Sequence, residues 1–146
     1  MYKVIVVGTD GSDRATVAFR EALELAKMTG AKLHAVQVVH SAVKTGFSDT
    51  SGGQFEIDNM RDRAERTSAQ LLAEAERQGV SAEVHNPGGV DVADTLISFA
   101  EAAGADLVVV GNLGMSGMKR LVLGSIPNKI SHHCPCSLLI VNTDSA

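Results

Sequence analysis

The chain carries the apolar run Asp106-Leu-Val-Val-Val110 directly before Gly111-Asn-Leu-Gly114, and Gly124-Ser125 follows further along. A short apolar run of this kind is typical of a buried strand. Glycines at its carboxyl end allow backbone N–H groups to approach a ligand closely, because no side chain crowds them. The G-x₂-G-x₉-G-S spacing therefore predicts a loop that holds phosphate.

The second half of this pattern, Gly124-Ser125-Ile126-Pro127, predicts the start of a short helix over 125–133. Ser125 is the expected N-cap, and Pro127 fits the first turn because its missing N–H costs little there. The unpaired N–H groups of a helix start attract anions. This end of the helix is therefore expected to face the same phosphate.

Two cations, Lys119 and Arg120, lie in the spacer between the glycines. A guanidinium in this place suits phosphate oxygens, so Arg120 is the preferred contact and Lys119 the weaker one. Ser116, in the same spacer, is weaker still. The alternative is a solvated pair of cations on a surface turn.

Apolar runs alternate with helical patterns along the whole chain. The expected strands are at 3–8, 32–39, 82–86, 107–111 and 137–142, and the expected helices at 12–29, 56–78, 91–103 and 125–133. This alternation predicts an α/β fold, a five-stranded doubly wound parallel sheet in the order 3-2-1-4-5 with helices on both faces. A chain of 146 residues fits one domain, 1–146, with one core. The Ser-, Thr- and Gly-rich segment 41–54 is expected to be a loop, either a lid over the site or a surface insertion.

The predicted strand order places the first and fourth strands side by side, where the connections leave toward opposite faces of the sheet. Ligands bind at the carboxyl ends of the strands at such a point. Two loops then meet, Gly8-Thr9-Asp10-Gly11-Ser12 and Gly111-Asn112-Leu113-Gly114. An acidic turn beside a glycine loop suits a nucleotide, because the turn offers acceptors to ribose or a metal and the loop offers donors to phosphate.

Asp10 and Val38 each have two interpretations. The Asp10 carboxylate either accepts from ribose hydroxyls or sits near Mg²⁺, or it belongs to a turn that caps the following helix, and both roles are compatible. Val38, at the end of the second predicted strand, either packs against an adenine or is a core valine. Gly8 would let a ligand pass close to the backbone.

Composition excludes several classes of protein. The formal charge of −4 argues against nonspecific DNA or RNA binding, which needs clustered cations. A hydrophobic content of 45% with 21% charged residues is ordinary for a globular protein and indicates no membrane span. The sequence from Met1 into Val4-Ile-Val-Val7 lacks the features of a signal peptide, so the expected location is cytoplasmic.

Cys134 and Cys136 flank Pro135 and follow His132 and His133. A bridge between cysteines so close in sequence would be strained, so no disulfide framework is expected. The cluster invites a metal hypothesis, but zinc sites usually carry two separated pairs of ligands. The favoured interpretation is a loop with free thiols that packs into the last strand.

The sequence favours a binding module over an enzyme. It lacks the G-x₄-G-K-[ST] loop of phosphoryl-transfer proteins and the G-x-S-x-G elbow of acyl-transfer enzymes. His34, His40 and His85 are scattered over strand and loop positions, and each is interpreted as structural or solvated rather than as a general base. The competing hypothesis is a slow ATPase or phosphotransferase that uses Asp10 and a metal.

The last predicted strand contains Leu138-Leu-Ile-Val141 and lies at a sheet edge. An edge strand exposes unpaired backbone groups unless something covers it. Pairing with a second copy would cover it. We therefore expect a homodimer through residues near Leu138 to Val141.

Four segments together resemble the universal stress protein family, in its nucleotide-binding branch. They are Ile5-Val-Val-Gly-Thr-Asp-Gly-Ser12, Ala105-Asp-Leu-Val-Val-Val-Gly111, the G-x₂-G-x₉-G-S element and Cys134-Pro135 before the last strand. The resemblance spans essentially the whole chain. It implies a five-stranded doubly wound domain that binds ATP, usually as a dimer, and that serves in a stress response or in signalling.

The resemblance also implies roles for single residues. Asp10 and Val38 would contact ribose and base, while Gly111, Gly114, Gly124, Ser125 and Ile126 would line ribose and phosphates. Gly-Asn-x-Gly paired with Gly-Ser-x-Pro resembles a subgroup of the family that favours cyclic AMP. The breadth of the family favours ATP, so ATP is the first expected ligand and cyclic AMP or AMP is the alternative. The candidate nucleotide contacts are Gly8, Thr9, Asp10, Val38, Gly111, Asn112, Gly114, Arg120, Gly124, Ser125 and Ile126, with Asp10 also a candidate Mg²⁺ ligand.

Overall fold

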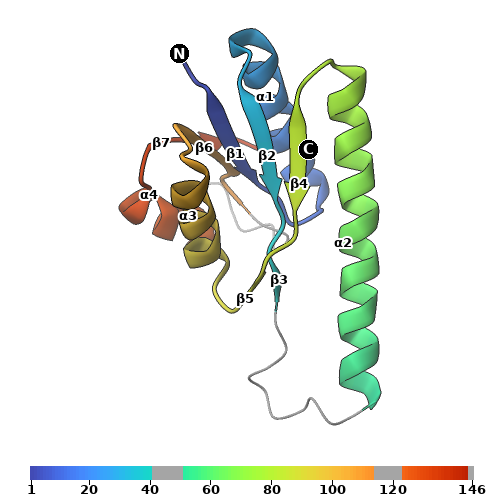
Figure 1. Cartoon of the computed structure of the whole chain (residues 1–146). Coiled ribbons are helices and arrows are strands. Elements are labelled where there is room, and N and C mark those ends of the chain that lie inside the picture. Colours follow the sequence, from blue (N-terminus) through green and yellow to red (C-terminus); the bar gives the residue numbers. More distant parts are fainter. Residues whose placement is uncertain (41–50, 114–122, 145–146) are drawn as a thin grey trace.

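Five parallel strands form the central sheet (Figure 1). The structure, a computed structural model, describes residues 1–40, 51–113 and 123–144. The strands are β1 Val4–Gly8, β2 Lys32–Val36, β4 Ala82–His85, β6 Leu107–Gly111 and β7 Ser137–Val141. They lie in the order β4-β2-β1-β6-β7, and every neighbouring pair is parallel. Counted along the chain, this is the order 3-2-1-4-5, so the predicted topology is confirmed.

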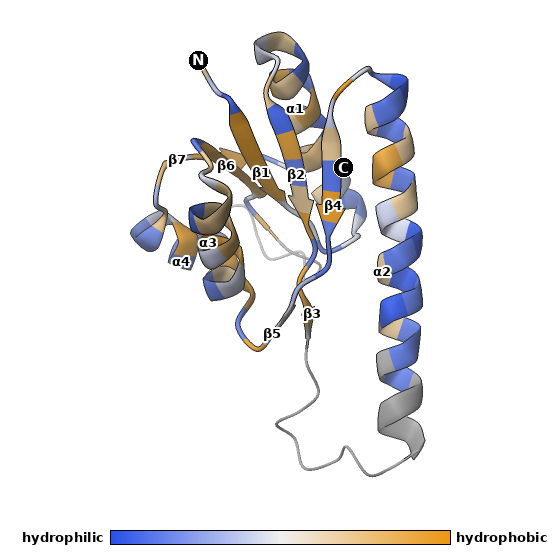
Figure 2. Ribbon diagram, viewed as in Figure 1, coloured by the Kyte–Doolittle hydropathy of each residue, from blue (hydrophilic) through white to orange (hydrophobic). Residues whose placement is uncertain are grey.

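Four helices cover the two faces of the sheet. α1, Asp13–Thr29, and α2, Ser51–Arg77, pack on one face, and α3, Val92–Ala103, and α4, Ser125–His133, pack on the other (Figure 1). Figure 2 shows hydrophobic residues concentrated on the strands and many hydrophilic ones along α2. Within the described ranges, none of the helices combines the length and the apolar character needed to cross a membrane.

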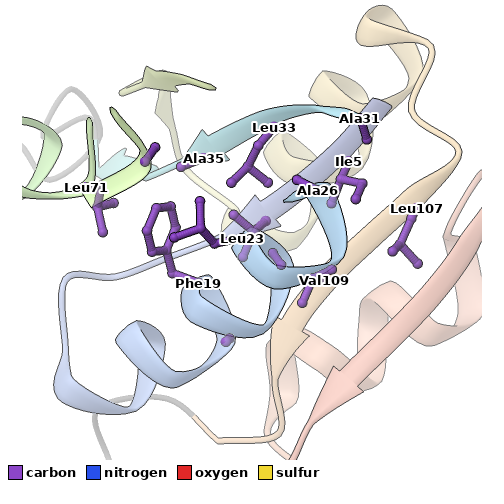
Figure 3. Packing of buried hydrophobic residues seen from close by; sticks show 14 of the residues in the cluster. Ile5, Phe19, Leu23, Ala26, Ala31, Leu33, Ala35, Leu71, Leu107 and Val109 are labelled. Atoms are coloured by element: carbon purple, nitrogen blue, oxygen red, sulfur yellow. The ribbon is translucent and has the colours of Figure 1, made fainter. Parts of the chain in front are cut away.

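Strand alternation divides the core into two clusters. On β1, Ile5 and Val7 point toward α1 and α2, whereas Val6 points toward α3 and α4. The first cluster centres on Phe19 and Leu23 of α1, each 1% exposed (Figure 3). Full burial of one such side chain stabilises the fold by about 1.5–3 kcal/mol. Helices therefore cover the central strands on both faces of the sheet, and the carboxyl ends of the strands are one place where a ligand could reach it.

The ends of α1 follow from single residues. The Ser12 hydroxyl oxygen accepts a hydrogen bond from the Ala15 N–H at 3.2 Å and caps the first turn. Gly30 ends the helix in the left-handed conformation, with φ 73°, and its N–H donates to the Ala26 carbonyl. The predicted helix over 12–29 is thus confirmed.

Two boundaries differ from the sequence prediction by more than one residue. The second strand ends at Val36, and β3, Val39–His40, instead pairs with β5, Gly88–Gly89, in a separate two-stranded sheet. α2 begins at Ser51 rather than at Glu56, so the prediction of a loop was wrong for 51–54. Residues 41–50 lie outside the described residues, and the lid hypothesis stays a prediction.

Candidate nucleotide site

The turn after β1 is shaped by its own side chains. The Thr9 N–H donates to the Val36 carbonyl at 3.0 Å, which ties the turn to the end of β2. One Asp10 carboxylate oxygen accepts from the Ser12 N–H at 2.9 Å, and the Thr9 hydroxyl oxygen accepts from the Gly11 N–H at 3.2 Å. Gly11 has φ 79°, which only glycine adopts without strain. Asp10 therefore holds the turn that precedes the cap of α1, and it does so as an exposed side chain.

Asn112, directly after β6, joins three segments. Its side-chain oxygen accepts from both the backbone N–H and the hydroxyl of Thr143, at 3.0 and 2.9 Å. Its own N–H donates to the Val141 carbonyl at 2.9 Å, and its carbonyl accepts from the Gly124 N–H at 3.0 Å. Thr143 is completely buried. Asn112 thus fixes the end of β6 against the end of β7 and against the start of α4.

The start of α4 differs by one residue from the prediction. Gly124 occupies the N-cap position and is buried, while Ser125 is the first helical residue and is exposed. No side chain caps this helix, so the expected capping role of Ser125 is wrong. Pro127 lies in the first turn, as predicted, and has no N–H to offer. The Ser125 and Ile126 N–H groups are therefore the ones that the helix geometry leaves for an anion.

Packing explains two of the glycines. A methyl group at Gly8 would lie 2.9 Å from Cδ2 of Leu96, so the absence of a side chain there lets α3 approach the sheet. A methyl group at Gly111 would lie 3.2 Å from Cγ2 of Thr143. Both residues stand at the carboxyl ends of neighbouring strands, β1 and β6. Their small size has a structural cause that is independent of any ligand.

Gln37 is a polar residue that the sequence analysis missed. Its side-chain oxygen is buried and has no hydrogen-bond partner among the residues that the structure describes. Its amide nitrogen lies near Gly11, because a methyl group added at Gly11 would be 3.6 Å from it. Val38 follows, half-buried against the cluster under α3. One polar residue inside the apolar run 35–39 was the signal that could have identified it.

Arg14, in the first turn of α1, is a second missed residue. Its Nη1 is buried and stands 3.8 Å from a carboxylate oxygen of Asp144, which follows β7. A partly buried guanidinium beside the turn after β1 adds a cation to this end of the sheet. Gly114 and Arg120, as well as Lys119 and Ser116, lie outside the described residues, so their contacts stay predictions.

The cysteines at the end of α4 pack inward as free thiols. Cys134 and Cys136 are half-buried against the cluster under α3. Burial, together with the neighbouring Cys134, raises the pKa of the Cys136 thiol to about 11. A thiol with so high a pKa is a poor nucleophile at neutral pH, because little thiolate is present. Cys136 is therefore suited to packing.

The arrangement can bind an anion with backbone donors, but it offers few groups for proton transfer. The ends of β1 and β6 lie side by side, and the Gly124–Asn112 hydrogen bond fixes the start of α4 to the end of β6. The described residues at these places, 8–12, 111–113 and 123–127, include no His, Cys or Lys. Asp10 is the one carboxylate among them.

Comparisons with known proteins agree with this geometry. The model of the universal stress protein family matches residues 1–142. The universal stress protein YxiE of Bacillus subtilis is 33% identical over 148 residues, which cover 97% of this chain and 99% of the relative. A universal stress protein of Methanocaldococcus jannaschii is 30% identical over 141 residues, covering 97% of this chain and 82% of the relative. A solved structure of a universal stress protein in complex with cAMP superposes with a TM-score of 0.74 at 27% identity, covering 98% of each chain.

Proposed function

We propose that this chain, which belongs to the universal stress protein family, binds an adenine nucleotide at the carboxyl ends of β1 and β6 and acts as a stress-response or signalling module. The observation that carries the proposal is the Gly124–Asn112 backbone hydrogen bond of 3.0 Å. It places the unpaired N–H groups at the start of α4 beside the point where ligands bind in doubly wound sheets.

In this proposal, backbone amides hold the phosphate. Ser125 and Ile126 supply N–H groups from the first turn of α4, where the helix dipole also favours an anion. Gly111 and Gly114 leave the backbone of the loop uncrowded, and Arg120 adds a cation. The side-chain oxygen of Asn112 is engaged by Thr143, so its side-chain amide nitrogen is the group that would donate to the nucleotide.

The turn after β1 and the end of β2 hold the nucleoside. Thr9 and Asp10 would accept from ribose hydroxyls, and Gly8 lies at the end of the same strand. Val38 offers an apolar surface to the base. The buried side-chain oxygen of Gln37, with no partner among the described residues, suits an exocyclic amino group nearby.

ATP is the first candidate ligand, and cyclic AMP is the second. The resemblance to the ATP-binding branch supports ATP. The similarity over the full chain to a structure in complex with cAMP supports cyclic AMP. With ATP, the exposed Asp10 carboxylate would be a suitable ligand for Mg²⁺, directly or through water. Mg²⁺ would supply charge neutralisation of the phosphates.

The module is proposed to act as a homodimer in the cytoplasm. β7 is an edge of the five-stranded sheet, and Leu138, Leu139 and Ile140 on it are only half-buried. Pairing of two copies through Leu138 to Val141 would cover these residues and the unpaired backbone groups. The two free thiols agree with a reducing compartment. Light scattering at micromolar concentration tests the dimer, and a mass of one chain would reject it.

Mass spectrometry of the nucleotide released from freshly purified protein tests the ligand. ATP, AMP and cyclic AMP have different masses, so the experiment identifies the bound species directly. Calorimetric titration of the emptied protein with each nucleotide then ranks their affinities. Absence of any adenine nucleotide, together with no binding heat for all three, would refute the proposal.

The competing function, slow ATP hydrolysis, is separated by turnover. We expect labelled ATP to remain intact with the wild-type protein at the rate of a protein-free control. Hydrolysis by the wild type that disappears in an identically purified Asp10→Asn variant would establish the ATPase instead. Binding of ATP without hydrolysis supports the module.

A further inference from the structure

Two histidines and a glutamate, far apart in sequence, meet on β2 and β4. The parallel register pairs His34 with Glu83 and Val36 with His85, so His34, Glu83 and His85 all project from the face of the sheet that α3 covers. β4 is an edge strand, and the Glu83 side chain is half exposed. This group has no part in the nucleotide site proposed above.

The donor atoms of the three residues converge. His34 Nδ1 lies 3.0 Å from His85 Nε2 and 3.5 Å from a carboxylate oxygen of Glu83. All three candidate ligand atoms are within 4.8 Å of one another. In a tetrahedral zinc site with bonds of about 2.0–2.1 Å, neighbouring ligand atoms stand about 3.3 Å apart. The two separations from His34 Nδ1 are within a few tenths of an ångström of this value, and the third, between His85 and Glu83, is no more than 4.8 Å, so a metal ion requires these side chains to shift toward one another.

The surroundings fix the two imidazoles before any ion binds. Phe99 of α3 packs against both rings, with centroid distances of 5.8 Å to His34 and 4.7 Å to His85. The His34 side chain is only 13% exposed. The two rings are therefore held by packing, with their candidate ligand atoms gathered in one place.

Lys32 is the group that competes with a metal. Its ammonium lies 2.8 Å from the Glu83 carboxylate. Because this ion pair is solvent-exposed, its loss costs little, and the flexible lysine can withdraw into water. The nearby positive charge lowers the affinity for a cation without blocking the site.

We propose that His34, Glu83 and His85 form a binding site for a divalent transition metal, with zinc the best match. Two imidazoles and one carboxylate are ligands that zinc accepts, and the half-exposed side of the cluster leaves a fourth position for water. The ion would clamp the edge strand β4 to β2. The site is independent of the nucleotide, so the failure of either proposal leaves the other standing.

Titration of the untagged, metal-stripped protein with Zn²⁺ tests the site. We expect one ion per chain, with heat of binding and a rise in the unfolding temperature. Loss of a residue that only hydrogen-bonds to a metal ligand costs about 10- to 100-fold in metal affinity. Loss of a ligand itself, in His34→Gln or His85→Gln, should therefore cost about 100-fold or more. Glu83→Gln should weaken binding as well. The matched control is the double variant His132→Gln, His133→Gln on α4, whose two exposed rings should be dispensable.

Two spectroscopic measurements on the wild type make the test independent of variant folding. X-ray absorption at the zinc edge should show two imidazoles and no sulfur in the first shell. Co²⁺ should give the visible bands of a four-coordinate N/O site without thiolate charge-transfer bands. Three results would overturn the proposal: sulfur ligation, binding that only the His132→Gln, His133→Gln variant abolishes, and no saturable binding below about 1 mM Zn²⁺.

Discussion

Replacement of Asn112 by alanine should destabilise the fold strongly, although the residue lies in a loop. The side-chain oxygen of Asn112 is the acceptor for two donors of Thr143, at 3.0 and 2.9 Å, and Thr143 is 0% exposed. Each buried donor left without a partner costs about 1–3 kcal/mol. Because the hydroxyl can rotate toward another acceptor, we expect Asn112→Ala to lower the free energy of unfolding by about 2–4 kcal/mol.

Urea unfolding followed by far-UV circular dichroism measures this loss at a fixed protein concentration. The chain has no Trp and a single Tyr, which makes fluorescence a poor probe. The matched control is Asn142→Ala, since Asn142 is exposed and its side-chain oxygen accepts one bond from the Asp144 N–H at 3.0 Å. That variant should stay within about 0.5 kcal/mol of the wild type.

A double-mutant cycle measures the contribution of the hydrogen bond between the Thr143 hydroxyl and Asn112. Thr143→Val removes the hydroxyl donor but keeps the backbone bond to Asn112, so its cost should be about 1 kcal/mol. In the Asn112→Ala background, the bond from the hydroxyl to Asn112 is already gone, so the same change should cost little. The coupling is then about 1 kcal/mol. An Asn112→Ala variant as stable as Asn142→Ala would refute the assignment of Asn112 as the link between β6 and β7.

Three further predictions concern other single residues. Gly124→Ala should lower nucleotide affinity, measured by calorimetry, by at least about tenfold, because the added methyl group would lie 3.3 Å from the Asn112 carbonyl oxygen. The control is Gly88→Ala, whose methyl group would have its nearest neighbour at 3.9 Å and should leave the affinity unchanged. Ser12→Ala should cost about 1 kcal/mol in urea unfolding through the lost helix cap, and Ser12→Asp should retain it; equal losses in both would contradict the capping role. The pKa of Asp91 is lowered, first by the Asp94 N–H and then by Lys129, so the stabilisation that its carboxylate gives is present above about pH 4 and is lost as the pH falls through the lowered pKa. Asp91→Asn should therefore lose less stability between pH 6 and pH 3 than the wild type does. An identical loss in both proteins would exclude this contribution.

Local signals account for the parts of the fold that the sequence predicted. The run Leu107 to Gly111 is a strand because four consecutive apolar residues are buried on both faces of a parallel sheet. Gly30 and Gly104 end helices in the left-handed conformation, and such ends are visible as a glycine after an apolar periodicity. The βαβ alternation predicted a doubly wound parallel sheet, and 3-2-1-4-5 is one of the orders that such a sheet adopts.

One of the two differences from the prediction has a clear physical cause. β3 and β5 are two residues each, too short for any periodicity, and they form only because their parent segments run side by side. The extra residues of α2 continue a long helix through Ser51-Gly-Gly-Gln54, a segment whose composition favours a loop. We have no physical account of this extension.

The nucleotide site and the proposed metal site differ in how much of each could be predicted from the sequence. The strand-end glycines and Asp10 form contiguous motifs, so their places could be predicted. The partner of Asn112 is Thr143, and no local pattern connects residues so far apart in the chain. His34 and His85 were interpreted as scattered histidines, because their contact depends on the register between β2 and β4. Register between strands is a property of tertiary packing.

The backbone bond from Gly124 to Asn112 also holds the two residues that flank 113–123 next to each other. It pins both ends of 113–123 to the framework, whatever residues stand between them. Doubling the length of a closed loop costs only about 0.6 kcal/mol in entropy. An engineer could therefore transplant loops of other lengths and charges between these anchors and alter which anion is preferred, while the sheet and its helices remain as they are.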